Sequence, residues 1–149
     1  MSAALPPIYR SSDQIAQLVL EFETRSLAPS QFNHHAHLTV ALWYLARMPF
    51  ADATATMRSN IQHFAASHHQ SQLYHETITM FWMRLLHHVL DTAGPNALIA
   101  DVVYRALCRF GSMQPFFQHY SRERAFSTEA RQQWVEPDLS PLPFGDPSQ

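Results

Sequence analysis

The sequence predicts an all-α protein: a single bundle of about five helices with a short C-terminal helix and an extended proline-rich tail. Apolar residues recur at helical spacing along most of the chain, and no segment shows a convincing strand alternation. The 149 residues are 46% hydrophobic and 15% charged, a composition typical of a globular chain with a real core. We therefore expect one domain over residues 1–149, in which residues 137–149 form the tail.

Three helices are expected in the first half of the chain. The first begins after Ser12 and ends before Pro29, because the residue preceding a proline is pushed out of the helical region. Ser30 is expected to cap a second helix that runs to about Met48. Pro49 then begins a third helix. Antiparallel helices joined by short loops indicate a bundle.

In the second half of the chain, apolar residues keep their helical spacing to about residue 110. A fourth helix is expected over about 73–92 and stops at Gly94, and a fifth runs to about Phe110. Beyond that point the helical signal weakens. Ser127 can cap a short helix over about 128–134. The last fifteen residues, "VEPDLSPLPFGDPSQ", contain four prolines and are expected to be extended.

The composition argues against several classes of function. The net charge is -2 with neutral histidines, so no basic surplus exists to neutralise nucleic-acid phosphates. The chain has no lysine, and its three glycines lie too far apart to build a phosphate-binding loop. A single cysteine forms no internal disulfide, which fits a reducing compartment. With no apolar run long enough to cross a bilayer, we expect a cytoplasmic protein without membrane contact.

Ten histidines are the unusual feature of this sequence, and three of them are expected to face inward. His34 and His37 are three residues apart and lie on the apolar stripe of the second helix, whereas His35 points sideways. His75 heads the apolar stripe of the fourth helix. If the two stripes share one core, the three imidazoles meet. Three protein nitrogens with open coordination positions are the layout of a catalytic metal site.

Two carboxylates and a hydroxyl are candidates to complete this site. Glu23 borders the apolar stripe of the first helix and is a candidate fourth ligand or a partner of a ligand. Glu76 and Thr79 are candidates to handle protons or to orient a ligand. A structural alternative stays open, in which each inward histidine is simply buried and hydrogen-bonded to a hydroxyl or carbonyl.

Known helical metal motifs do not account for the pattern. The zinc protease motif H-E-x-x-H requires a histidine at the position of Thr79, and threonine is a poor zinc ligand. Ferritin-like di-iron sites require E-x-x-H on two helices, and this spacing occurs nowhere in the chain. The site therefore belongs to neither class.

A series of short motifs resembles that of a group of small bacterial all-helical proteins. The series is Phe22-Glu23, His34-x-x-His37-Leu38, "ALWYL" at 41–45, "YHETIT" at 74–79, "FS" at 126–127 and "VEPDL" at 135–139. It covers most of the chain. The resemblance implies that Glu23, His34, His37 and His75-Glu76 belong to one pattern, and it implies no particular activity.

These observations lead to the expectation of a metal-dependent enzyme that acts on a small molecule. Imidazole suits iron, zinc, copper or nickel as the divalent metal. An interior rich in aromatic residues and methionine favours a small apolar substrate and an oxidoreductase of the non-haem iron type over a metal-assisted hydrolase. The alternative is a non-catalytic helical metal-binding or interaction module, in which Trp43, opposite His34 on its helix, joins two copies in a homodimer.

Overall fold

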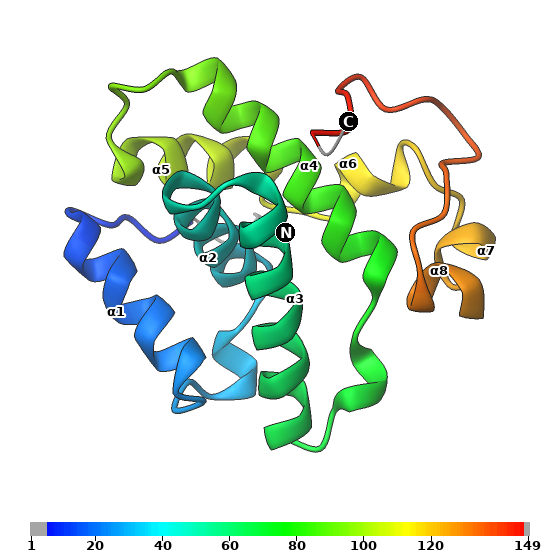
Figure 1. Ribbon diagram of the computed structural model, residues 1–149, viewed down its shortest axis with the longest axis horizontal. Coiled ribbons are helices and arrows are strands. Elements are labelled where there is room, and N and C mark those ends of the chain that lie inside the picture. Colours follow the sequence, from blue (N-terminus) through cyan, green and yellow to red (C-terminus); the bar gives the residue numbers. More distant parts are fainter. Residues whose placement is uncertain (1–5, 148–149) are drawn as a thin grey trace.

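The computed structural model, which describes residues 6–147, confirms the all-α prediction. The described chain forms helices and no strand, and five of the α-helices are long (Figure 1). The elements are α1 (Ser12–Glu23), η1 (Pro29–Gln31), α2 (His34–Arg47), α3 (Phe50–Ser67), η2 (Ser71–Leu73), α4 (Glu76–Ala93), α5 (Ile99–Phe110), α6 (Gln114–Phe117), α7 (Arg122–Ala125) and α8 (Thr128–Gln132), where η denotes a short 3₁₀ helix. Residues 148 and 149, the end of the expected tail, lie outside the described residues.

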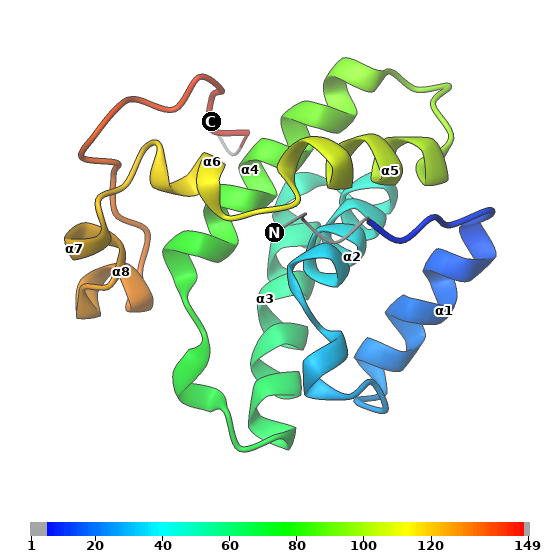
Figure 2. The ribbon, with the colours of Figure 1, turned by 180° about the vertical axis from the view of Figure 1, so that it is seen from behind.

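The centre of the bundle is α2, which packs against α1, α3, α4 and α5 (Figures 1 and 2). Its consecutive residues Leu38 to Leu42 are all fully buried, so this helix has no solvent-facing side along that stretch. A helix that is buried all round belongs in the core of a domain. The two inward histidines of α2 are therefore carried by the most enclosed element of the fold.

Two helices begin later than the sequence indicates. The prediction that Ser30 caps the second helix is wrong: residues 29–31 form η1, and α2 begins at His34 with Asn33 as its N-cap. The Asn33 side chain accepts a hydrogen bond of 3.0 Å from the backbone N–H of Ala36. The fourth helix likewise begins at Glu76, after η2. Both junctions contain a short 3₁₀ turn that helical periodicity does not reveal.

The helix ends agree better with the sequence. Gly94 follows α4 with φ of 87°, a conformation that glycine adopts without a steric penalty. Ser127 caps α8, accepting from the backbone N–H of Ala130 at 3.1 Å, as predicted. The short helices α6 and α7 were not predicted, because four residues are too few to show a helical period.

Residues 133–147 contain neither helix nor strand and run from α8 back along α4 (Figure 1). Val135 is buried, and Trp134, Leu142 and Phe144 pack against the core. The guanidinium of Arg84 on α4 lies 3.9 Å from the centroid of the Trp134 ring and forms an ion pair of 3.1 Å with Asp146. The segment is thus attached to the bundle by both apolar and charged contacts.

No helix in the described range is long and apolar enough to cross a membrane.

Candidate active site

The N-terminal turn of α2 presents His34 and His37 toward different neighbours. His34 donates a hydrogen bond from Nε2 to the carbonyl of Phe110, at the end of α5, over 2.9 Å. Its ring meets the edge of the buried Trp82 ring, with centroids 4.8 Å apart. Burial lowers the pKa of His34 below its ordinary value, although the bond to Phe110 opposes this. With Nε2 engaged, Nδ1 is the ring nitrogen left with a lone pair.

His37 faces a cavity of about 300 Å³ that lies between η1, α2, α3 and the start of α4. The cavity is lined mostly by apolar side chains, namely Pro29, Phe32, Ile61, Phe64, Ala65, Leu73 and Ile78. The imidazole contacts the Phe32 ring with centroids 5.5 Å apart, and neither of its nitrogens has a hydrogen-bond partner among the described residues. His37 is therefore the histidine that a bound molecule can reach without breaking an existing bond.

The electrostatic state of His37 follows from its surroundings. Burial, helped by the neighbouring His34 imidazole, lowers the pKa of His37 from 6.5 to about 4. At neutral pH the ring is therefore uncharged. A neutral imidazole has a lone pair that can accept a hydrogen bond or bind a metal ion.

His75 also lines this cavity, but it is the N-cap of α4 rather than a residue within the helix. Its Nδ1 accepts from the backbone N–H of Ile78 at 3.1 Å, and its Nε2 donates to the carbonyl of Ala125 at 2.5 Å. Those partners fix the tautomer, with the proton on Nε2. Burial lowers the pKa of His75. Since both nitrogens are bonded to the protein, the ring matches the structural alternative of a buried, satisfied histidine.

Thr79 and Tyr74 bring two hydroxyl-bearing side chains to the same cavity. The Thr79 hydroxyl donates to the backbone carbonyl of His75 over 2.8 Å, one turn back along α4. The Tyr74 hydroxyl donates to Glu76 over 2.5 Å. Both are therefore held by the protein before any ligand arrives.

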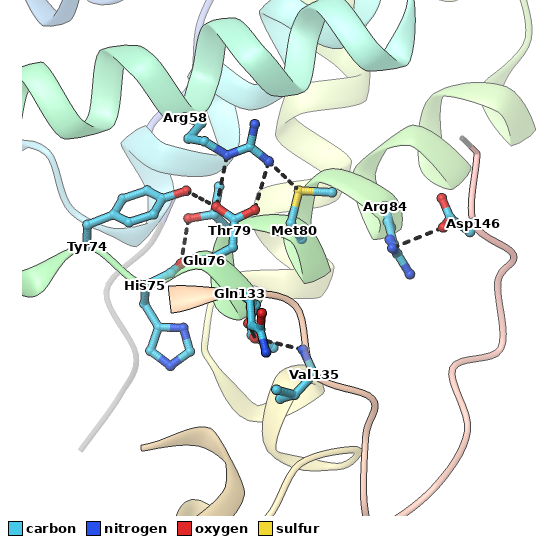
Figure 3. A network of polar contacts seen from close by, with 11 residues as sticks. Arg58, Tyr74, His75, Glu76, Thr79, Met80, Arg84, Gln133, Val135 and Asp146 are labelled. Carbon is cyan, nitrogen blue, oxygen red and sulfur yellow. Dashed lines mark hydrogen bonds and ion pairs between the residues drawn. The ribbon is translucent and has the colours of Figure 1, made fainter. Parts of the chain in front are cut away.

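Glu76 belongs to a separate polar network, which Figure 3 shows. Its two carboxylate oxygens accept from Arg58 of α3 at 2.9 and 2.7 Å, a bidentate pair. Figure 3 also shows the His75 imidazole directed away from this network. Burial raises the pKa of Glu76, but the hydrogen bonds from Arg58 and Tyr74 outweigh that effect and lower it below its ordinary value.

Arg58 and Tyr74 are partners of Glu76 that the sequence did not predict. A signal for Tyr74 was present, since it lies two residues before Glu76 in "YHET". Arg58 is 18 residues away from Glu76 and on another helix. Only the packing of α3 against α4 brings the two together, so no local pattern could have found this pair.

Glu23 is placed elsewhere in the fold. The side chain is exposed at the end of α1 and accepts a hydrogen bond of 2.8 Å from the hydroxyl of Tyr44 on α2. Asn60 of α3 donates to the same hydroxyl over 2.9 Å. Glu23 thus ties three helices together through Tyr44, and it is not among the residues that line the His37 cavity.

The predicted site is only partly brought together. His37, His75 and Thr79 line one cavity, whereas His34 turns toward α5 and both carboxylates bond to other partners. Over residues 6–147, no group of three or more histidine, cysteine, aspartate or glutamate side chains is arranged to hold a metal ion.

Comparisons with known proteins add no further constraint. No protein-family model, curated protein or solved structure matches this chain. Its candidate site must be judged on its own chemistry.

Proposed function

We propose that the protein is an enzyme that acts on a small, largely apolar molecule bound in the His37 cavity. The observation that carries this proposal is the His37 imidazole, which lines an apolar cavity and has no hydrogen-bond partner in the described chain. His75, Thr79 and Tyr74 are already bonded to the protein. Gln70 also lines the cavity, and its side-chain amide has no hydrogen-bond partner among the described residues. An apolar pocket with a few polar groups, some of them available to a ligand, is the usual form of a small-molecule site.

A metal ion bound by His37 is the second part of the proposal, with His34 as the nearest further imidazole, because it lies three residues earlier on α2 and acts electrostatically on His37. Metal ligands must be unprotonated, and a pKa of about 4 keeps His37 in that form at neutral pH. The same low pKa makes His37 a weak proton acceptor, which favours ligation over general base catalysis. His34 bonds a backbone carbonyl through Nε2, as metal-binding histidines commonly do through their other nitrogen. The remaining coordination positions would belong to solvent or substrate.

An oxidoreductase suits this cavity better than a hydrolase. A metal-assisted hydrolase uses a general base to activate water, and none of the described residues that line the cavity is acidic. Glu76, the carboxylate expected in that role, is held by Arg58 and Tyr74. We therefore propose a non-haem iron-type oxidoreductase, with zinc, copper and nickel as the other metals that imidazole ligands accept.

The metal part of the proposal is tested by metal analysis of protein purified without a histidine tag. We expect stoichiometric metal in the wild type, loss in His37→Ala and weakened binding in His34→Ala. His63→Ala removes an exposed histidine of α3 and serves as the matched control. Metal-free protein whose Tm does not respond to Fe(II), Zn(II), Cu(II) or Ni(II) would contradict a metal site.

The cavity itself is tested by a screen of small aromatic and aliphatic molecules that follows amide NMR shifts. Ala65 lines the cavity, and Ala65→Phe should fill it and abolish binding. Oxygen consumption by the iron-loaded protein with each ligand then tests the reaction class. Ligand binding without metal or turnover would support the non-catalytic module instead. Shifts that persist in Ala65→Phe would place the ligand elsewhere.

A further inference from the structure

A second cavity lies between α4, α5 and the C-terminal segment, on residues that the His37 site does not use. Its volume is about 540 Å³, within the range of small-molecule sites. Buried Leu85, Val102 and Ala106 form an apolar floor, and the half-buried Phe144 of the C-terminal segment forms one wall. None of its lining residues is shared with the His37 cavity.

Two arginines give this apolar groove a positive edge. Arg105 and Arg109 are four residues apart on the exposed side of α5, so they lie on the same face of the helix, and both line the groove. Each guanidinium offers several N–H donors in a planar fork. The guanidinium of Arg109 lies 5.0 Å from the centroid of the Phe110 ring, next to the apolar floor.

The positive charge at the groove is not neutralised by the described part of the chain. The ion pairs between described side chains join Arg58 to Glu76 and Arg84 to Asp146, and neither pair involves Arg105 or Arg109. No acidic side chain lines the groove. Asp101, one turn before Arg105 on α5, forms no ion pair with it. The guanidinium donors are thus available to an external anion.

We propose that this groove binds a small aliphatic carboxylic acid. The apolar floor and Phe144 would cover the hydrocarbon part, and Arg105 and Arg109 would bind the carboxylate. Arginine matches carboxylate geometry and pairs with it through two parallel hydrogen bonds. The combination of apolar lining and unneutralised guanidinium groups distinguishes the groove from the His37 cavity, which has no cationic side chain at neutral pH.

The test is calorimetric titration of the full-length protein with decanoate and, separately, with 1-decanol. Decanoate should bind more tightly than the alcohol to the wild type. The double substitution Arg105→Gln with Arg109→Gln should weaken decanoate binding about tenfold to a hundredfold and leave 1-decanol binding unchanged. The control, Arg10→Gln with Arg25→Gln, removes the same charge from exposed positions outside the groove and should alter affinity by less than about threefold.

Substitutions that each fill one of the two cavities show which cavity binds decanoate. Thr92 is exposed and lines the groove, so Thr92→Trp should weaken binding of both probes while the fold is kept. Ala65→Phe, in the His37 cavity, should leave decanoate binding intact. Failure of decanoate to bind, equal affinity for the two probes, or decanoate binding insensitive to the arginine pair would overturn the proposal. Loss of binding in Ala65→Phe instead of Thr92→Trp would overturn it as well.

Discussion

His75 shows how one residue can be read two ways until its partners are known. The sequence placed it at the head of an apolar stripe, which suggested a metal ligand. In the structure, one ring nitrogen caps α4 and the other bonds the carbonyl of Ala125. A buried position is expected both for a metal ligand and for a structural histidine. Only the hydrogen-bond partners of the two ring nitrogens distinguish these interpretations.

Replacing His75 with alanine should destabilise the protein by about 2–4 kcal/mol. The change removes the N-cap acceptor of α4 and leaves the carbonyl of the buried Ala125 without its donor. Urea unfolding monitored by circular dichroism measures the loss.

Two further substitutions serve as controls for that measurement. His75→Asn should recover about 1 kcal/mol, because asparagine is a good N-cap. His63→Ala, at an exposed site, should stay within about 0.5 kcal/mol of the wild type. If His75→Ala lowers the free energy of unfolding by less than about 0.5 kcal/mol, the N-cap and the bond to Ala125 contribute little to stability.

His37 should make stability depend on pH between about 4 and 6.5. Its folded pKa is about 4, below the unfolded value of 6.5, so in this interval the unfolded chain binds more protons. The contribution of His37 to the free energy of unfolding is therefore fully present above about pH 6.5. It falls on acidification, by on the order of 3 kcal/mol when pH 4 is reached. Unfolding free energies measured across this range should show the slope.

Substitutions show whether His37 causes the change of the unfolding free energy with pH. His37→Gln removes the titrating group and should flatten the pH dependence relative to the wild type, whereas His63→Ala should keep it. An unchanged slope in His37→Gln would mean that the imidazole is not held neutral in the folded state.

At the scale of elements, the start of α4 is held from two sides. Arg58 of α3 binds Glu76 on one side (Figure 3). On the other side, the Thr77 hydroxyl donates a hydrogen bond to the carbonyl of Gln133 in the C-terminal segment. The carboxylate of Glu76, which was expected to take part in catalysis, therefore forms an ion pair that joins α3 to α4. The sequence identified Glu76 as a candidate site residue, but it did not reveal Arg58 as its partner.

Glu76→Gln should cost about 1–2 kcal/mol at neutral pH, because it replaces a charged, bidentate partner of the half-exposed Arg58 with a neutral one. The folded pKa of Glu76 lies below its ordinary value, so the ionised form contributes stability above about pH 4.5 that is lost on acidification. The difference between wild type and variant should shrink below that pH in chemical denaturation. Glu123→Gln, at an exposed position, should show no such difference.

Helix boundaries were predictable where a single residue type sets them. Gly94 ends α4 and Ser127 caps α8, since each signal acts within a few residues. Ser30 was an equally plausible cap for α2, yet Asn33 takes that role after a 3₁₀ turn. Which of two nearby capping residues is used depends on how the loop packs, and local sequence does not encode that choice.

At the scale of the whole molecule, α2 is the element that every long helix contacts. Its Leu42 is fully buried. Leu42→Ala should therefore cost about 2–5 kcal/mol, the usual range for a large-to-small change in a core. Thermal unfolding should still be a single transition when followed by both tryptophan fluorescence and circular dichroism.

Leu139→Ala provides the matched control, because Leu139 is 57% exposed. We expect that variant to stay within about 0.5 kcal/mol of the wild type. Two separate transitions in Leu42→Ala would indicate that the helices around α2 unfold independently.

The fold was more predictable than the site for a physical reason. Five long helices follow from periodicity, which is a local property, and their number and class agree with the structure. The convergence of side chains depends on the rotation of each helix about its axis and on loop contacts. His34 and His37 share one helix face in the sequence, yet one bonds the end of α5 and the other faces a cavity beside α3.

The dependence of α4 on the C-terminal segment has a consequence for synthesis on the ribosome. The Thr77 hydroxyl donates to the carbonyl of Gln133 and accepts from the N–H of Val135, and His75 needs the carbonyl of Ala125. The helices up to α5 can emerge and associate while these groups still lack partners. Translation reaches those residues within seconds of completing α5. The native contacts at the start of α4 therefore form only after synthesis has passed the end of α5, because the carbonyl group that His75 needs lies some fifty residues further along the chain.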